Sequence, residues 1–246
     1  MQSLYGAIAN YNKKINMVRI DEVYQQVLAL ANKEQRGYIT PQEFNLFANQ
    51  AQMDIFEDYF YDLNQFKRIP GNNSKYADVS DIIEEKISIF KTASSSITSD
   101  GYYYLNNIAN LYRIINITMQ TTPPRVMEEV NIEDWDIVQS SPLTRALLST
   151  PKWYKDDGQL YFSHIPSGGI TINYIRKPDE VKWAYTVVQG TPIYNGTNSV
   201  NFELHPSDEV ELVVKILELA GIAIKDNSLY QIAAQEDVED IQQEKR

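Results

Sequence analysis

The stretch from Thr40 to Lys67 constrains this chain most, because it predicts one long amphipathic helix. Thr40 is a preferred N-cap, Pro41 suits the first helical position, and Glu43 completes a capping box with Thr40. Apolar residues then recur at helical spacing: Phe44, Phe47, Ala51, Ile55, Phe56, Phe60 and Leu63. At about 1.5 Å per residue this helix spans about 40 Å, more than a small core needs. We therefore expect it to pack against helices from elsewhere in the chain or from another copy.

The composition is that of a folded protein without disulfides. Among 246 residues, 43% are hydrophobic and 22% are charged, which is enough for a substantial core. The absence of cysteine excludes disulfide and thiolate sites, and the net charge of −11 predicts repulsion from nucleic acid. We expect no membrane span and no signal peptide. The 17 tyrosines suit protein interfaces or reflect a compositional bias.

Helical patterns occur near both ends of the chain. Ile20–Ala31 predicts a helix that forms a hairpin with 41–67, and 79–91 predicts a short helix, with a strand as the alternative. Pro206 and the acids after it begin another apolar-faced helix. We predict an α+β fold in which N- and C-terminal helices form a helical bundle with a β-rich insert between them. The expected domains are an N-terminal arm (1–17), a helical hairpin of the bundle (18–68), a mixed, β-rich insert (69–201), and C-terminal helices with a charged tail (202–246).

The β-rich insert is read from short β-prone runs between turns. The expected strands are 102–104, 112–118, 124–131, 151–155, 159–164 and 170–176. Asp157-Gly158 is a strong hairpin signal, and 167–169 is a second one. Residues 132–149 predict a short helix followed by a break at Pro142 and a loop, and 185–201 predict an excursion from the sheet.

The sequence shows no recognisable catalytic, cofactor or metal motif. His164 and His205 are not spaced as metal ligands, and no phosphate-binding loop or nucleophile elbow occurs. A calcium-loop reading of 32–43 fails because Arg36 stands at a ligand position. Acidic groups at Glu128/Glu129 and Glu133/Asp134/Asp136 have the residue type used in glycoside hydrolysis, but acids also favour helix starts. We expect a protein that is not an enzyme and holds no cofactor or metal.

The aromatic residues and the basic residues of the β region can each be interpreted in two ways, as a binding surface or as an ordinary part of the fold. The aromatics could form a stacking platform for a sugar or single-stranded nucleic acid, or they could be core residues of the sheet. The basic residues could form a partner-facing patch or a solvated face. The aromatics are Tyr102, Tyr103, Tyr104, Tyr112, Trp153, Tyr154, Tyr161, Phe162 and Tyr174, and the basic residues are Lys152, Lys155, Arg176, Lys177 and Lys182.

Four stretches of the chain resemble a family of virion proteins. They are TPQEFNLFANQAQMDIFEDYF (40–60), SSPLTRALLSTPKWY (140–154), NYIRKPDEVKWAY (173–185) and FELHPSDEVELVVKILELAGI (202–222). They look like structural proteins of tailed phages that infect Bacteroidetes, the crAss-like podoviruses. More narrowly, they resemble the neck or ring proteins that stack beneath the portal and are similar in plan to the head-to-tail adaptor of short-tailed phages. The resemblance extends from about residue 20 to about residue 232.

This resemblance implies a virion structural protein made in the cytoplasm of the bacterial host. The expected role is one subunit of a ring in the portal–tail connector, which joins capsid to tail and forms part of the DNA ejection conduit. The implied partners are further copies of the chain in a twelve-fold cyclic ring, the portal protein, and adjacent ring or tail proteins. DNA would pass through the lumen without sequence-specific binding. The alternative is a minor tail or carbohydrate-binding module that uses the aromatic strands.

For a ring, the helices 40–67 and 206–225 are expected to build the body, while the insert and the termini contact neighbouring proteins. An acidic lumen would keep DNA from sticking during ejection. The residues predicted for the assembly interface are Phe44, Phe47, Phe56, Tyr59, Phe60, Tyr102, Tyr104, Trp153, Tyr154, Trp183, Tyr185, Leu217 and Gly221.

Overall fold

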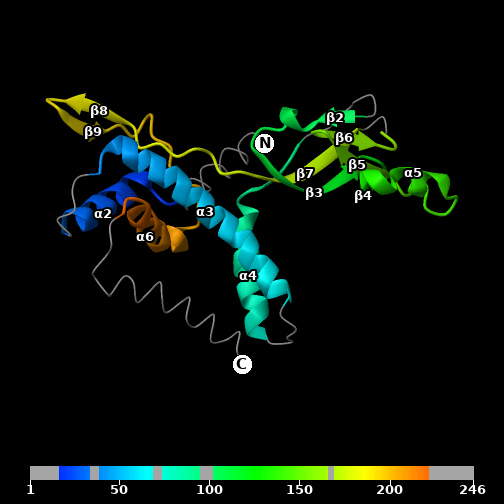
Figure 1. Ribbon diagram of the computed structural model, residues 1–246, viewed down its shortest axis with the longest axis horizontal. Coiled ribbons are helices and arrows are strands. Elements are labelled where there is room, and N and C mark those ends of the chain that lie inside the picture. Colours follow the sequence, from blue (N-terminus) through cyan, green and yellow to red (C-terminus); the bar gives the residue numbers. More distant parts are fainter. Residues whose placement is uncertain (1–16, 34–38, 69–73, 95–101, 166–168, 222–246) are drawn as a thin grey trace. The chain divides into compact units, whose positions relative to one another are not determined.

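A computed structural model describes residues 17–33, 39–68, 74–94, 102–165 and 169–221 (Figure 1). The chain divides into two units: unit 1 contains Met1–Lys86 and Pro178–Arg246, and unit 2 contains Ile87–Lys177. The domain ranges predicted above stay a prediction. The expected N-terminal arm up to residue 16, the calcium-like loop at 34–38, most of the second hairpin turn at 167–169 and the charged tail lie outside the described residues.

Unit 1 is built from helices and one small hairpin. The long predicted helix is confirmed as α3, and its capping box is confirmed. The Thr40 amide donates to Glu43 Oε2 at 2.9 Å, and the Glu43 amide donates to Thr40 Oγ1 at 3.3 Å. The elements are α2 (Ile20–Lys33), α3 (Pro41–Arg68), α4 (Ser74–Ser88, whose last two residues belong to unit 2), β8 (Tyr185–Val188), β9 (Thr191–Tyr194), η2 (Pro206–Asp208) and α6 (Glu209–Leu219).

The core of unit 1 lies where α6 packs against α2 and α3. The Tyr24 ring of α2 lies 4.7 Å from Phe44 and 4.3 Å from Trp183, measured between ring centroids. The Trp183 indole N–H donates to Asp21 Oδ1 at 3.0 Å, which satisfies the polar atom of a buried ring. An aromatic cluster therefore fixes the segment before β8 onto the helices.

The polar face of α3 binds an extended segment of the same unit through side-chain amides. Asn45 accepts from the Trp183 N–H at 2.7 Å and donates to its carbonyl at 3.2 Å. Asn49 likewise accepts from the Val181 N–H at 2.8 Å and donates to the Val181 carbonyl at 3.0 Å. The spacing matches because four residues along a helix, from Asn45 to Asn49, rise about 6 Å, and two residues along an extended chain, from Val181 to Trp183, span about 6.6 Å. Gln52 continues the row by donating to the Asp179 carbonyl at 2.9 Å.

Unit 2 is dominated by one seven-stranded sheet with the order β1-β7-β3-β4-β5-β6-β2. Every pairing is antiparallel except β4 with β5, which run parallel. The predicted tight turn is confirmed between β5 and β6, where Asp157 and Gly158 have φ of 41° and 72°. The elements are β1 (Lys91–Ala93), β2 (Tyr102–Tyr104), η1 (Leu105–Asn107), β3 (Leu111–Met119), β4 (Arg125–Glu129), α5 (Ile132–Ser140), β5 (Lys152–Asp156), β6 (Gln159–Phe162) and β7 (Ile170–Arg176).

The core of unit 2 covers one face of this sheet. Ile117 of β3 faces Met127 of β4 and Ile172 of β7 in register, and directly opposite side chains share a face. Met119 and Ile170 form the next pair along the same strands. The cluster is completed by Leu105, Ile108, Trp153, Leu160 and Phe162.

The predicted fold is wrong in its central feature, the terminal helical bundle. The described residues contain five α-helices, the seven-stranded sheet dominates, and α6 is the last described helix rather than part of a bundle of terminal helices. An apolar stripe predicts that a helix buries one face, but it does not identify the partner. On α3 the amide row beside the apolar stripe binds the extended segment around Val181, a partner that the helical pattern did not predict.

Candidate assembly surfaces

Residues 132–148, here called the α5 arm, leave large apolar side chains in water. None of the α5 residues is buried. Leu143 is 97% exposed, Ile137 68% and Leu148 58%. Isolated exposed apolar residues are normal, but a contiguous group of them marks an interaction surface. The α5 arm is therefore the strongest candidate for contact with another protein.

Local sequence explains why this arm forms where it does. Acidic Glu133 and Asp134 occupy the first turn of α5, where they favour the positive end of the helix dipole. The helix ends at Ser140 before Pro142, and the turn after it is closed by the Arg145 amide donating to the Ser141 carbonyl at 2.9 Å. In Figure 1, α5 lies beside β4 and β5.

An aromatic row crosses the sheet face opposite the core of unit 2. Tyr154, Tyr161 and Tyr102 stand directly opposite one another on β5, β6 and β2. The Tyr154 and Tyr161 rings stack at 4.8 Å with 7° between their planes, and Tyr102 lies 6.3 Å from Tyr161. Trp135 of α5 packs on Tyr154 at 4.6 Å, and Tyr104 extends the row beyond Tyr102 at 5.6 Å.

This row remains accessible along its length. Tyr102 and Tyr104 are 44% and 47% exposed, and the other three rings are half-buried. The pKa of Tyr154 is raised, mainly by partial burial of its phenol and further by the neighbouring Tyr161, Asp156 and Asp136. The row therefore offers flat rings with polar tips, which suits stacking on a sugar or on side chains of a partner.

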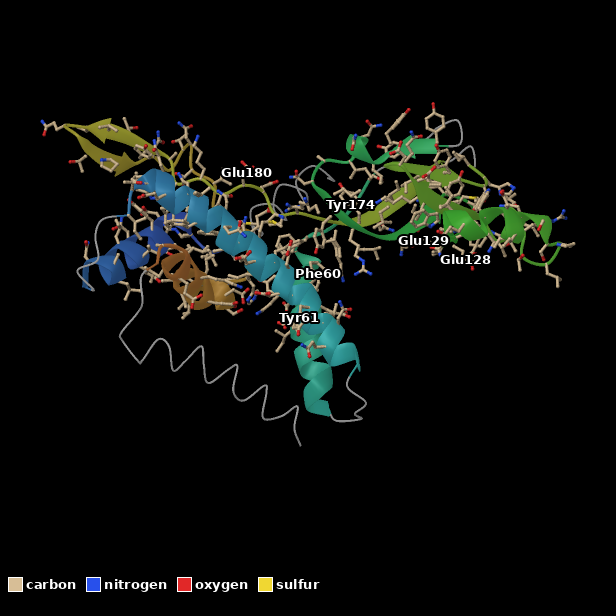
Figure 2. All side chains as sticks on the ribbon, in the orientation of Figure 1. Phe60, Tyr61, Glu128, Glu129, Tyr174 and Glu180 are labelled. Atoms are coloured by element: carbon tan, nitrogen blue, oxygen red, sulfur yellow. The ribbon has the colours of Figure 1, made fainter. Side chains whose placement is uncertain are left out.

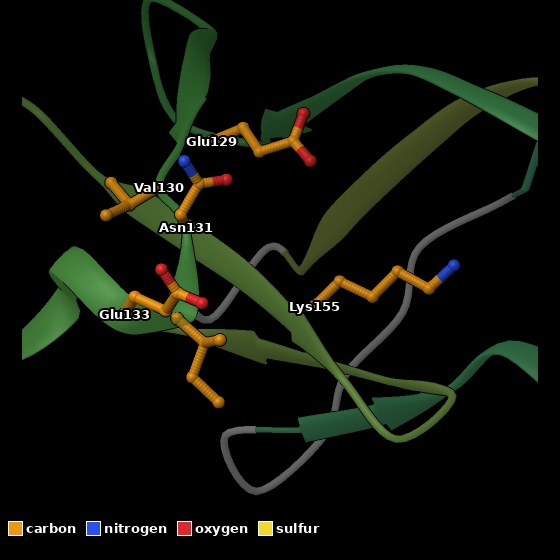
Figure 3. Close-up of a pocket in the computed structure, with 6 residues that line it drawn as sticks. Glu129, Val130, Asn131, Glu133 and Lys155 are labelled. Carbon is orange, nitrogen blue, oxygen red and sulfur yellow. The ribbon is translucent and has the colours of Figure 1, made fainter.

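A hollow of about 360 Å³ lies where β4 leads into α5 (Figure 3). Its lining includes the carboxylates of Glu129 and Glu133 and the side chain of Lys155. Glu128 and Glu129 mark the end of β4 in Figure 2, and Glu128 pairs with Lys152, which is buried. The predicted basic group is thus divided: Lys152 is paired, Lys155 lines the hollow, Arg176 ends β7 and Lys177 follows it.

The β8–β9 hairpin of unit 1 exposes apolar side chains on both of its faces. Val187 is 60% exposed on one face, and Val188 and Ile193 are 49% and 51% exposed on the other. Positive φ at Gln189 and Gly190 forms the tight turn that joins the strands. A two-stranded hairpin is marginal on its own, so its base relies on Trp183, whose ring lies 5.8 Å from Tyr185.

The residues predicted for the assembly interface divide by burial. Those buried inside their own unit fill the core, and those partly or fully exposed are accessible to a partner. Because burial within one chain does not test contacts between copies, the predicted interface stays a prediction. The buried residues are Phe44, Phe56, Tyr59, Trp153, Trp183 and Leu217, and the others are Phe47, Phe60, Tyr102, Tyr104, Tyr154, Tyr185 and Gly221.

The sequence-based platform of nine aromatics is separated by the sheet into two faces. Trp153 and Phe162 are buried in the core, and Tyr103 and Tyr174 pack against it, whereas the row occupies the other face. The alternation of side chains along each strand would have separated these sets. Trp135 was missed because its acidic neighbours indicated only a helix start, and no local pattern showed that α5 returns to β5.

No helix in the described ranges has the length and hydropathy needed to cross a membrane. Within the same ranges, no group of three or more His, Cys, Asp or Glu residues is placed to hold a metal ion. Comparison with known proteins finds no family model that matches the chain, and no curated protein matches it significantly.

Proposed function

We propose that this chain is a non-enzymatic structural subunit of a phage virion. In this proposal, copies of the chain form a cyclic ring of twelve in the connector that joins capsid to tail. The portal and adjacent ring or tail proteins are its partners, and DNA passes through the ring. The virion context and the copy number come from the resemblance to ring proteins of crAss-like podoviruses.

One observation carries the proposal: the exposed apolar side chains of the α5 arm. A side chain such as Leu143, 97% exposed, gains free energy when a partner removes it from water, by about 25 cal/mol per Å² of apolar area. The β8–β9 hairpin provides a second surface of this kind. Two different surfaces suit the heterologous contacts from which cyclic rings are built. The net charge of −11 suits a conduit that does not retain DNA.

Mass photometry of the purified protein, alone and mixed with its cognate portal protein, tests this proposal. The chain has a mass of 28.3 kDa, so a ring of twelve has a mass of about 340 kDa. We expect that species alone, or a portal complex heavier by that amount. A strict monomer that does not bind portal would contradict the ring and favour a peripheral tail role.

The aromatic row supports a second candidate function, a carbohydrate-binding tail module. Stacked, half-exposed rings such as Tyr154 and Tyr161 are the kind of surface on which sugars stack. Glycan titration should then quench the fluorescence of Trp135, and Trp135→Phe should remove that signal. Trp153→Phe is the matched control, because Trp153 is buried in the core. Saturable quenching by a glycan, with no ring formed, would favour this second function.

A further inference from the structure

Unit 2 has no net charge, but its charges are separated. Residues 87–177 contain eight Lys or Arg and eight Asp or Glu, so the net charge of −11 comes from the rest of the chain. Every charged residue of α5 is acidic, while every charged residue of β1, β3 and β7 is basic. In the sheet order, β1, β7 and β3 are adjacent, and α5 packs at β5, beyond β4. Unit 2 therefore has an acidic part and a basic part.

The acidic part combines carboxylates with exposed apolar side chains. Trp135 faces the sheet through its contact with Tyr154, so the helical period places Glu133 and Ile137 on the outer face of α5. Asp134 and Asp136 flank that face, and all four side chains are exposed. The outer face of α5 therefore presents the apolar side chain of Ile137 among the carboxylates of Glu133, Asp134 and Asp136.

The basic part has the complementary character. Lys91 of β1 and Arg113 of β3 both stand opposite Ile175 of β7, so their exposed side chains share one face of the sheet. Exposed apolar side chains occur on the same strand, Tyr112 at 36% and Ile115 at 45%. Tyr112 and Ile115 stand at the two places where the register between β3 and β7 shifts, so β3 carries exposed apolar side chains next to the positive charges. The three strands β1, β7 and β3 carry no carboxylate.

We propose that the outer face of α5 of one copy docks on the β1–β7–β3 strands of the next copy. This inference rests on the proposed ring and names the contact that repeats around it. Opposite charges steer and select such a contact, and the exposed apolar residues supply the area that is buried. Pairing two α5 helices would instead oppose carboxylates to carboxylates. The β8–β9 hairpin has no charged residue to match them. A head-to-tail contact of unlike surfaces generates a ring when the rotation between neighbouring copies closes.

Engineered cysteines test the contact cleanly, because the chain has none of its own. Ile137→Cys and Ile115→Cys proteins are treated with a short bis-maleimide, each alone and as an equal mixture. We expect a cross-linked dimer in the mixture and monomer in each single sample. Dimer from Ile137→Cys alone would show that α5 pairs with itself and would overturn the proposal. Absence of a cross-link in the mixture would overturn it as well.

Charge reversal provides the second arm of the test. Asp134→Lys with Asp136→Lys on the Ile137→Cys protein should lower the cross-linked yield about tenfold. Adding Lys91→Glu with Arg113→Glu on the Ile115→Cys protein should restore it. The controls are Glu57→Lys and Lys182→Glu, exposed charges of unit 1, which should leave the yield unchanged. No loss, or loss without rescue, overturns the proposal.

The two proposals fail in distinguishable ways. If mass photometry shows a ring but the mixed cross-link is absent, the docking mode is wrong and the ring remains. If neither a ring nor a portal complex forms and the cross-link is absent, both proposals are wrong.

Discussion

At the scale of single residues, Asp208 does not cap its own helix but binds side chains from other elements. Asp is a preferred N-cap, and Asp208 stands at the N-cap of α6, but its side chain makes no capping bond. Its carboxylate instead accepts from the Tyr59 hydroxyl at 2.5 Å and from Lys86 Nζ at 2.6 Å. Asp208 is 3% exposed, so a lone charge there would be costly. The three side chains join α3, α4 and the start of α6.

Tyr59 gives unit 1 a stability that decreases in alkali. Burial, together with the negative charge of Asp208, raises the pKa of Tyr59 above its ordinary value of about 10. Above pH 10 the unfolded phenol loses its proton while the folded one keeps it. The unfolded state then binds fewer protons, and the free energy of unfolding decreases by about 1.4 kcal/mol per pH unit.

Tyr59→Phe should remove this alkaline dependence. At pH 7 the variant should lose about 2 kcal/mol of stability, because Asp208 loses a donor. Above pH 10 the difference from the native chain should shrink as pH rises. Urea unfolding at pH 7, 9, 10 and 11 measures both. Tyr61→Phe, an exposed phenol on the same helix, is the control, and a constant difference for Tyr59→Phe would contradict the prediction.

Asn49 should be among the most sensitive polar residues of α3. Its amide makes three bonds, two to the backbone of Val181 and one to the Asn45 carbonyl at 2.7 Å. Asn49→Ala leaves the partly buried Val181 groups without partners and should cost about 2 kcal/mol. Gln50→Ala, one residue away on the exposed side, should change the unfolding free energy by less than about 0.5 kcal/mol. Urea titrations of the two variants make the comparison, and equal effects would contradict it.

At the scale of elements, local signals predicted helices and strands well, and their partners poorly. The capping box fixed the start of α3, and Asp157-Gly158 fixed the β5–β6 turn, because both devices act within a few residues. The sequence did not reveal that Asn45 and Asn49 hold an extended segment more than 130 residues away. This pairing arises because four residues of a helix and two residues of an extended segment advance by nearly the same distance. Neither the helix sequence nor the sequence of the extended segment indicates the other.

The attachment of α5 should depend on Trp135. Because no α5 residue is buried, the contact with Tyr154 is its main anchor to the sheet, and an aromatic pair contributes about 1 kcal/mol. Trp135→Ala should raise the rate of trypsin cleavage after Arg145 about fivefold, while global stability changes little. Tyr104→Ala, at the far end of the row, is the control. Equal cleavage of the two variants would contradict this anchoring role.

At the scale of the whole molecule, the exposed apolar side chains of the α5 arm have a purpose if several copies of the chain assemble and cover them. The arm was predicted as a helix and a loop, but its exposure was not, because a sequence pattern does not distinguish a core contact from a contact between copies. The sequence pattern does not show that Leu143, Leu147 and Leu148 of this loop are exposed, at 97%, 42% and 58%.

Leu143→Ser therefore separates folding from assembly. The side chain is 97% exposed, so its loss should leave the melting temperature of the monomer within about 1 °C of the native value. If a neighbouring copy or the portal buries this leucine, the substitution should cost about 2 kcal/mol per contact and shift the assembly midpoint at least tenfold in concentration. Leu46→Ser is the matched control, because Leu46 is likewise an exposed leucine, at 70%, and belongs to α3 of unit 1 rather than to the α5 arm. Mass photometry over a dilution series reads the midpoint, and an unchanged midpoint for Leu143→Ser would remove the α5 arm from the assembly.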